Sequence, residues 1–265
     1  MAPLVYTDPP AQYFYSPRPL AATPQLITGP FATPYEGGFF LFELRMPNDY
    51  PHRPPRVKLL TTGGGRVRFN PNLYACGKVC LSILGTWAGP GWTPAQSIGS
   101  VCLSIQSLMN EKPYHNEPGF EEARNPRDPD DYNDVVRHET LRAAVLDMCG
   151  ATAMHRSIPA PLRELMAELL PSFADYYRAT CDRERHRDGS AFCDPFGQNV
   201  GHFRFRELRT RLDQLLGAQT DGSVGLEDAD GCAGETNGGV GAVPGAAPGA
   251  RAEVSVVGTC TSLYY

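Results

Sequence analysis

Two residues of this chain, Cys80 and Asn72, have types and a spacing that could perform acyl transfer, with the asparagine eight residues before the thiol. A thiolate is the strongest ordinary side-chain nucleophile near neutral pH, and it can carry an acyl group as a thioester. When an amine attacks that thioester, negative charge builds on the carbonyl oxygen, and a preorganised amide N–H can stabilise it by a few kcal/mol. A free cysteine is more often an inert, buried residue, so the pair alone does not decide between packing and catalysis.

The wider composition excludes several classes of function. The 265 residues carry a formal net charge of −5 and no dense cluster of lysine and arginine, which argues against nucleic acid as a partner. The eight cysteines are dispersed without the spacing of a zinc site, which favours reduced thiols, no metal and no cofactor. Residues 1–20 lack a signal-peptide pattern, and no apolar run could cross a bilayer. We therefore expect no membrane partner and a cytoplasmic or nuclear protein.

Five segments around this pair resemble, in order and spacing, those of ubiquitin-conjugating enzymes. The family signature reads His-Pro-Asn, then Gly-x-hydrophobic-Cys-Leu, then Trp-Ser/Thr-Pro-Ala, and the matching runs here are 70–72 (NPN), 77–81 (GKVCL) and 92–95 (WTPA). Upstream, the run 29–40 (GPFATPYEGGFF) is similar to the family's first turn and second strand, and 49–57 (DYPHRPPRV) to its proline-rich crossover. The resemblance covers residues 25–149.

This resemblance implies a role for each motif residue. Cys80 would be the nucleophile, and Asn72 would either stabilise the oxyanion or hold the loop that does so. His115 and Asn116 stand at the gate that faces the incoming lysine. Asn116 has no charge, so it can orient the lysine but cannot act as a base. A histidine is the side chain best suited to accept a proton near neutral pH, so His115 either takes that role or merely packs in the gate. Asn70 replaces a family histidine that is mostly structural.

The implied activity is that of a transferase. It would carry ubiquitin or a ubiquitin-like modifier on Cys80 and pass it to lysines of substrate proteins, with a ubiquitin-activating enzyme and a RING or HECT ligase as partners. Leu60, Pro94 and Ala95 stand at ligase-contacting positions. The alternative is a non-catalytic variant of the fold that binds modifier or ligase as a regulatory or scaffold protein. Known variants of that type lack the cysteine, and this chain keeps it.

Three runs narrow the resemblance to one subtype of the family, which has a larger loop beyond the cysteine and a helical extension after the core. They are 26–42 (LITGPFATPYEGGFFLF), 78–87 (KVCLSILGTW) and 112–121 (KPYHNEPGFE). The subtype implies a FAT10-type modifier besides ubiquitin. We expect the loop between Trp87 and Trp92 to limit which ligases or lysines reach Cys80.

The hydrophobic pattern divides the chain into four parts, of which the first two are an amino-terminal segment and the core. Residues 1–24 are proline-rich and cannot form the continuous amphipathic helix with which the family contacts its activating enzyme, which favours the non-catalytic alternative. For residues 25–150 the resemblance implies an α+β UBC fold, a four-stranded antiparallel meander sheet packed on helices. Apolar patterning predicts strands near 39–44 and 56–60, a helix that begins at Pro94, and a helix over 130–148.

The other two parts follow the core. Residues 151–216 are predicted to form a helical extension, with helices over 162–183, broken near Pro171, and over 203–216. Their apolar stripes should pack on the core or on a partner. Residues 217–265 are rich in glycine and alanine, which predicts a disordered and dispensable tail.

Overall fold

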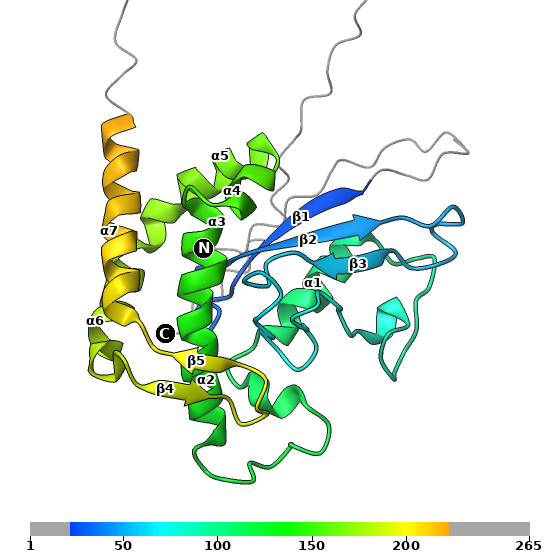
Figure 1. The fold of residues 1–265 in the computed structure, drawn as a ribbon. Coiled ribbons are helices and arrows are strands. Elements are labelled where there is room, and N and C mark those ends of the chain that lie inside the picture. Colours follow the sequence, from blue (N-terminus) through cyan, green and yellow to red (C-terminus); the bar gives the residue numbers. More distant parts are fainter. Residues whose placement is uncertain (1–21, 223–265) are drawn as a thin grey trace, which may run out of the picture.

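A three-stranded antiparallel sheet organises the computed structural model, which describes residues 22–222. Its strands are β1 (Thr23–Thr28), β2 (Phe39–Arg45) and β3 (Arg56–Leu59), paired in the order β1-β2-β3 (Figure 1). Side chains alternate across β2, so Phe39 and Leu41 enter one hydrophobic cluster while Phe40 and Phe42 enter another. Both faces of the sheet are therefore covered, which explains why β2 is apolar at successive positions.

The expected fourth strand is not formed as a continuous ladder. Isolated bridges pair Lys58 with Lys78, and Leu73 with Val79. The Leu59 N–H donates to the Gly77 carbonyl at 2.9 Å, but the Cys80 N–H turns away and donates to Asn72 instead. Gly77 has a φ of 89°, and a Cβ there would lie 2.5 Å from the Leu59 carbonyl oxygen. The close approach to β3 thus requires a glycine, and the chain leaves the sheet in order to build the Cys80 loop.

Helix α1 (Ile98–Leu108) covers the face of the sheet that holds Phe40 and Phe42. The predicted start at Pro94 is wrong, because Ser97 caps the helix and exchanges hydrogen bonds with Ser100 in a capping box. A long helical segment follows, made of α2 (Asp128–Glu139), a π-helical stretch (Thr140–Leu146) and α3 (Asp147–Cys149). This segment corresponds to the helix predicted over 130–148.

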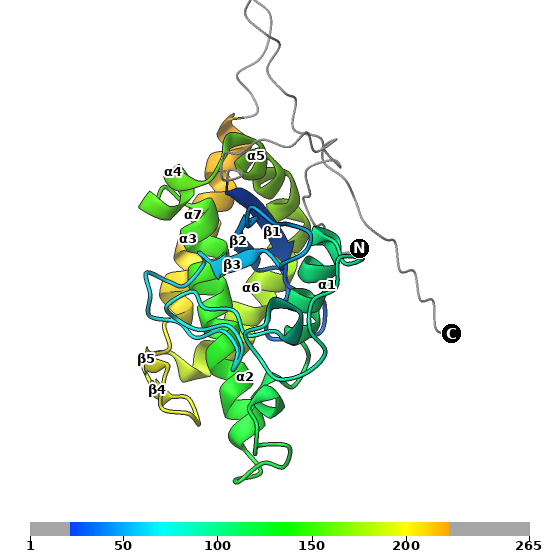
Figure 2. The same cartoon turned by 90° about the vertical axis from the view of Figure 1, so that its right-hand side faces the viewer.

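The helical extension packs on the other face of the sheet. It comprises α4 (Ala153–Ser157), α5 (Ala160–Leu169), α6 (Ala174–Arg183) and α7 (Phe205–Gly222), with a 3-10 turn at Leu170–Phe173 that contains Pro171. Its apolar stripes join Leu26, Phe39 and Leu41 of the sheet in one buried cluster. Figure 2 shows the sheet between α1 on one side and α3 and α7 on the other. Because α7 continues to Gly222, the prediction that the tail begins at residue 217 is wrong.

A short hairpin within the extension has no counterpart in the sequence predictions. Strands β4 (Ala191–Cys193) and β5 (Val200–His202) pair antiparallel and lie beside α2 in Figure 1. Phe192 and Phe203 pack around His138 of α2, with ring centroids 5.6 and 5.4 Å from the imidazole. The Arg204 N–H donates to His138 Nε2 at 3.1 Å. The hairpin is therefore fixed to the core and not only to the extension.

The proline-rich segment up to residue 21 and the tail beyond residue 222 lie outside the described residues, and so do the predictions about them. Among the described helices, none is both long and apolar enough to span a membrane.

Candidate active site

Cys80 and Asn72 are joined by reciprocal hydrogen bonds. The Cys80 N–H donates to the Asn72 carbonyl, and Asn72 Nδ2 donates to the Cys80 carbonyl, each at 2.9 Å. Both residues are buried. The pairing places the two predicted site residues side by side and uses one of the two Nδ2 hydrogens of Asn72. In this state Asn72 holds the Cys80 loop, and its second N–H remains for another acceptor.

Asn70 is the centre of the network that fixes Asn72. It is fully buried, and its Oδ1 accepts from the Asn72 N–H at 3.0 Å. Its Nδ2 donates to the Tyr35 hydroxyl at 3.0 Å and to the Leu108 carbonyl at 2.8 Å. The Tyr35 hydroxyl donates in turn to the Phe69 carbonyl at 2.7 Å. An amide suits this position because it supplies two donors and an acceptor without a charge to bury. The predicted structural role of Asn70 agrees with these contacts.

The gate segment, residues 113–120, is bound to the same network through Asn116. Asn116 Nδ2 donates to the Leu108 carbonyl at 3.0 Å and to Asn70 Oδ1 at 3.4 Å, and its Oδ1 accepts from Asn110 Nδ2 at 3.0 Å. We call Asn70, Asn72, Asn110 and Asn116 the asparagine frame. Both donors of Asn116 are occupied within it, so a lysine could use only the remaining lone pair of Oδ1.

His115 is oriented by the gate backbone. Its Nδ1 lies 2.7 Å from the Phe120 carbonyl oxygen, which can only accept, so Nδ1 carries the hydrogen. In the neutral ring Nε2 is then the basic nitrogen. The side chain is half-buried, which leaves it able to meet a solvent-borne group.

The loop after Cys80 folds back over its own start. Thr86 Oγ1 accepts from the Leu81 N–H at 3.0 Å and donates to the Val79 carbonyl at 2.8 Å. Gly89 passes close to Ser82, since a Cβ on Gly89 would lie 3.0 Å from the Ser82 Cβ. Cys80 is only 1% exposed. A thioester partner can therefore reach the thiol only if the covering side chains move.

The sequence analysis missed a salt bridge that joins the Asn70–Asn72 segment to the gate. The Arg68 guanidinium lies 2.9 Å from the Glu117 carboxylate, and it also donates to the Pro71 carbonyl. It stacks over the Tyr74 ring at 4.3 Å from the ring centroid. Arg68 thus connects the Asn70–Asn72 segment with the gate. A basic and an acidic residue so far apart in the chain give no local signal of this contact.

Of the predicted ligase-contacting residues, two are exposed and one is half-buried. Pro94 and Ala95 are exposed. Leu60 is half-buried and packs against the extension cluster, so it is less exposed than the resemblance implies. Its N–H continues the β3 ladder by donating to the Leu41 carbonyl at 2.8 Å. That register points its side chain toward the face that the extension covers.

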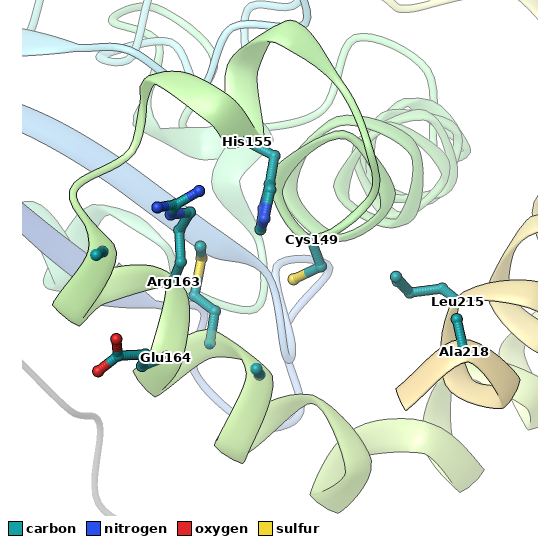
Figure 3. Close-up of a pocket in the computed structure, with 9 residues that line it drawn as sticks. Cys149, His155, Arg163, Glu164, Leu215 and Ala218 are labelled. Atoms are coloured by element: carbon teal, nitrogen blue, oxygen red, sulfur yellow. The ribbon is translucent and has the colours of Figure 1, made fainter. Parts of the chain in front are cut away.

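A cavity lies beside Cys149, between the end of α3 and helices of the extension. It has a volume of about 360 Å³ and is lined by α5, the end of α7, Cys149 and His155 (Figure 3). Burial raises the pKa of the Cys149 thiol to about 12. His155 Nδ1 is held 2.7 Å from the Met148 carbonyl. A thiol with such a pKa is not a nucleophile near neutral pH. Among the described residues, no group of three or more histidine, cysteine or acidic side chains could hold a metal ion.

Comparisons with known proteins identify the family to which this chain belongs. A sequence model described as "Ubiquitin-conjugating enzyme" matches residues 12–139. A protein of Xenopus tropicalis, ubiquitin-conjugating enzyme E2 Z, is 53% identical over 213 residues, which cover 80% of this chain and 67% of the relative. The chain therefore belongs to the ubiquitin-conjugating enzyme family and has the UBC fold.

Within the family, the subtype indicated by the three diagnostic runs is confirmed. The human E2 Z is 54% identical to this chain over 210 residues, which cover 78% of this chain and 58% of the human protein. A "Dual E2 ubiquitin-conjugating enzyme/E3 ubiquitin-protein ligase BIRC6" of Homo sapiens is 37% identical over 211 residues, which cover 74% of this chain and 4% of that protein. The chain thus spans somewhat more than half the length of the human E2 Z.

Proposed function

We propose that this protein is an active conjugating enzyme that carries ubiquitin or a ubiquitin-like modifier as a thioester on Cys80. The observation that supports it most is the reciprocal Cys80–Asn72 pair, held by the asparagine frame. A cysteine that only packed would not need a buried amide fixed against its own backbone. The frame also brings Asn116 of the gate, which lies 44 residues after Asn72 and 36 after Cys80, to the same place.

Loading would be a transthiolation. The Cys80 thiolate attacks the thioester carbonyl on a ubiquitin-activating enzyme, a new S–C bond forms, and the activating enzyme's cysteine leaves as a thiolate. In the second step a substrate lysine amine attacks the Cys80 thioester. The second N–H of Asn72 would donate to the developing oxyanion, and His115 Nε2 would accept the proton that the lysine nitrogen loses. An isopeptide bond forms and Cys80 leaves as the thiolate.

A ligase would bind where two exposed loops meet. Trp92 Nε1 donates to the Pro51 carbonyl at 2.7 Å, and the Trp92 ring lies 6.0 Å from that of Tyr50. These contacts hold the loop around Pro51 next to exposed Pro94 and Ala95. We propose this composite surface, without Leu60, as the contact for a RING or HECT ligase that brings substrate proteins. The modifier is ubiquitin or one of the FAT10 type.

The test is a charging assay with ATP, ubiquitin and its activating enzyme, repeated with a FAT10-type modifier and its own activating enzyme. A DTT-sensitive adduct should form on the wild type and vanish in Cys80→Ala. Lys58, Lys78 and Lys112 are the only lysines in the sequence. A variant with all three changed to arginine therefore removes every side-chain amine of the chain that could accept the modifier, and its DTT-sensitive adduct should persist. If neither modifier forms an adduct on the wild type, the catalytic proposal is wrong.

One observation favours the second candidate, a non-catalytic scaffold of the same fold. Cys80 is 1% exposed, which is unusual for a residue that must meet another protein's thioester. A scaffold would bind ubiquitin or a ligase without charging. Binding measured by NMR titration with labelled ubiquitin, in the absence of any adduct, would support this candidate.

A further inference from the structure

The turn of the β4–β5 hairpin, residues 194–199, reaches the candidate active site from the carboxy-terminal extension. Asp194 makes the turn rigid, since its carboxylate accepts from the N–H groups of Phe196, Gln198 and Asn199 at 2.8 to 3.1 Å. Asp194 and Asn199 are both buried, at 3% exposure each. A surface hairpin that only closed the extension would not need a buried, fully bonded turn.

Asn199 binds the segment that leads into the asparagine frame. Its Oδ1 accepts from the Arg68 N–H and its Nδ2 donates to the Arg68 carbonyl, both at 2.9 Å. The two residues are 131 positions apart in the chain. The side-chain amide therefore replaces a strand partner for Arg68. Its Nδ2 also donates to Asp194 at 2.8 Å. This contact fixes the backbone two residues before Asn70.

Phe196 binds the gate. Its ring stacks on Tyr114 with 5.2 Å between centroids and an interplanar angle of 16°. It also meets the rings of Phe120 and Tyr132 edge-on, at 5.1 and 5.3 Å. Phe120 supplies the carbonyl that orients His115. A single residue of the hairpin thus contacts both ends of the gate segment.

The two contacts reinforce each other through Arg68. Asn199 holds the Arg68 backbone, and the Arg68 side chain reaches Glu117 in the gate that Phe196 packs against. The turn, the Asn70–Asn72 segment and the gate therefore form a closed ring of contacts. In the part of the chain that the structure describes, the other polar side-chain contacts between the Asn70–Asn72 segment and the gate are the Arg68–Glu117 salt bridge and the Asn70–Asn116 hydrogen bond.

We propose that Asn199 and Phe196 are positioning residues of the active site, so that the carboxy-terminal extension sets the rate at which the Cys80 thioester is transferred. This inference rests on the proposed function. It assigns to the hairpin a part in the chemistry and not only in folding. Small displacements of reacting groups are costly, since a misplacement of about 1 Å can slow a reaction roughly a hundredfold.

The test is single-turnover discharge with the full chain. Wild type, Asn199→Ala and Phe196→Ala are charged with ubiquitin, activation is quenched, and free lysine is added. The first-order rate constant for loss of the DTT-sensitive adduct should fall about tenfold or more in both variants. Partial unfolding lowers the amplitude of charging but not this rate constant. Phe196→Tyr keeps the ring and should restore the rate. Val200→Ala is the matched control, because Val200 adjoins Asn199 in the chain and is 71% exposed.

A second measurement needs no charging. In both alanine variants, hydrogen exchange of the backbone amides over 68–72 and 114–120 should accelerate, while exchange in α1 should stay as in the wild type. Unchanged exchange in these segments, or discharge at the wild-type rate, would overturn the positioning role. Absence of any wild-type adduct would instead count against the proposed function, and the exchange data would still decide whether the turn holds the site.

Discussion

The Cys80 loop and the Cys149 cavity both contain a cysteine, yet the groups around the two thiols differ. Around Cys149 there is an open cavity of about 360 Å³, but burial raises the pKa of the thiol to about 12 and His155 is bound to a backbone carbonyl. Around Cys80 the fixed groups are amides, which leave a hydrogen-bond donor on Asn72. The gate that Asn116 joins to the same frame holds His115 with Nε2 as its basic nitrogen. The comparison shows that a cavity beside a thiol does not make a nucleophile. The site that we propose as reactive differs in having a hydrogen-bond donor held in place by other side chains.

The largest expected difference between the two regions is the effect of removing each cysteine on formation of the ubiquitin thioester. Cys80→Ala should abolish the DTT-sensitive ubiquitin adduct, because Cys80 is the thiol that lies in the segment held by Asn72. Cys149→Ala should leave the initial rate of charging within about twofold of the wild type, a change of less than about 0.5 kcal/mol in the barrier. Non-reducing gels of the two variants would compare them directly. Loss of the adduct in Cys149→Ala would show that the two regions are not separate.

The next largest effect should be on stability, when the extension that lines the Cys149 cavity is removed. A chain that ends after Ala151 would expose Leu26, Phe39 and Leu41, which the extension buries. Exposure of such side chains costs roughly 1.5–3 kcal/mol each, and the sum is comparable to the whole stability of a domain, about 5–15 kcal/mol. Thermal melts should show a much lower midpoint or no cooperative transition, and the activating enzyme or modifier accepted should change.

A chain that ends after Gly222 is the matched control for that truncation. It keeps α7 entire, whereas an end at residue 217 would cut the helix. We expect it to melt and charge like the full chain. Equal melting points for the two truncations would mean that the extension is a passive appendage.

Asn72→Ala separates the two roles of the Cys80 site. If the second N–H of Asn72 stabilises the oxyanion, transfer to lysine should slow roughly a hundredfold or more while charging survives. If Asn72 acts only by holding the Cys80 carbonyl, charging and transfer should fall together. Single-turnover rates for each step distinguish these results. Val200→Ala again serves as an exposed control.

The smallest effect concerns thiol reactivity as a function of pH. With a pKa of about 12, Cys149 is ionised at pH 8 to roughly one part in ten thousand. Its alkylation by iodoacetamide should therefore be slow and should rise about tenfold per pH unit up to pH 12, provided that the fold persists. Of the cysteines that the structure describes, the exposed Cys76 and Cys193 should be alkylated first. Mass spectrometry of peptides after brief labelling measures each site. Fast labelling of Cys149 at pH 8 would mean that the cavity opens readily to water.

The sequence predicted the features whose signal is local. The Cys80–Asn72 spacing, the apolar strand 39–44 and the break at Pro171 each depend on a few neighbouring residues, and each is present in the structure. Errors at the start of α1 and the end of α7 arose at helix ends. There a capping side chain such as Ser97, or tertiary packing, decides the boundary, and periodicity does not.

Only the tertiary structure decided what holds the site. Asn199 and Arg68 are 131 residues apart, and nothing in either local sequence marks them as partners. The same is true of Phe196 in the gate cluster and of Leu60, whose burial depends on an extension that begins about 90 residues later. Local periodicity reports which face of an element is apolar. Which segment finally covers that face, and which amide meets which backbone, depends on packing over the whole chain.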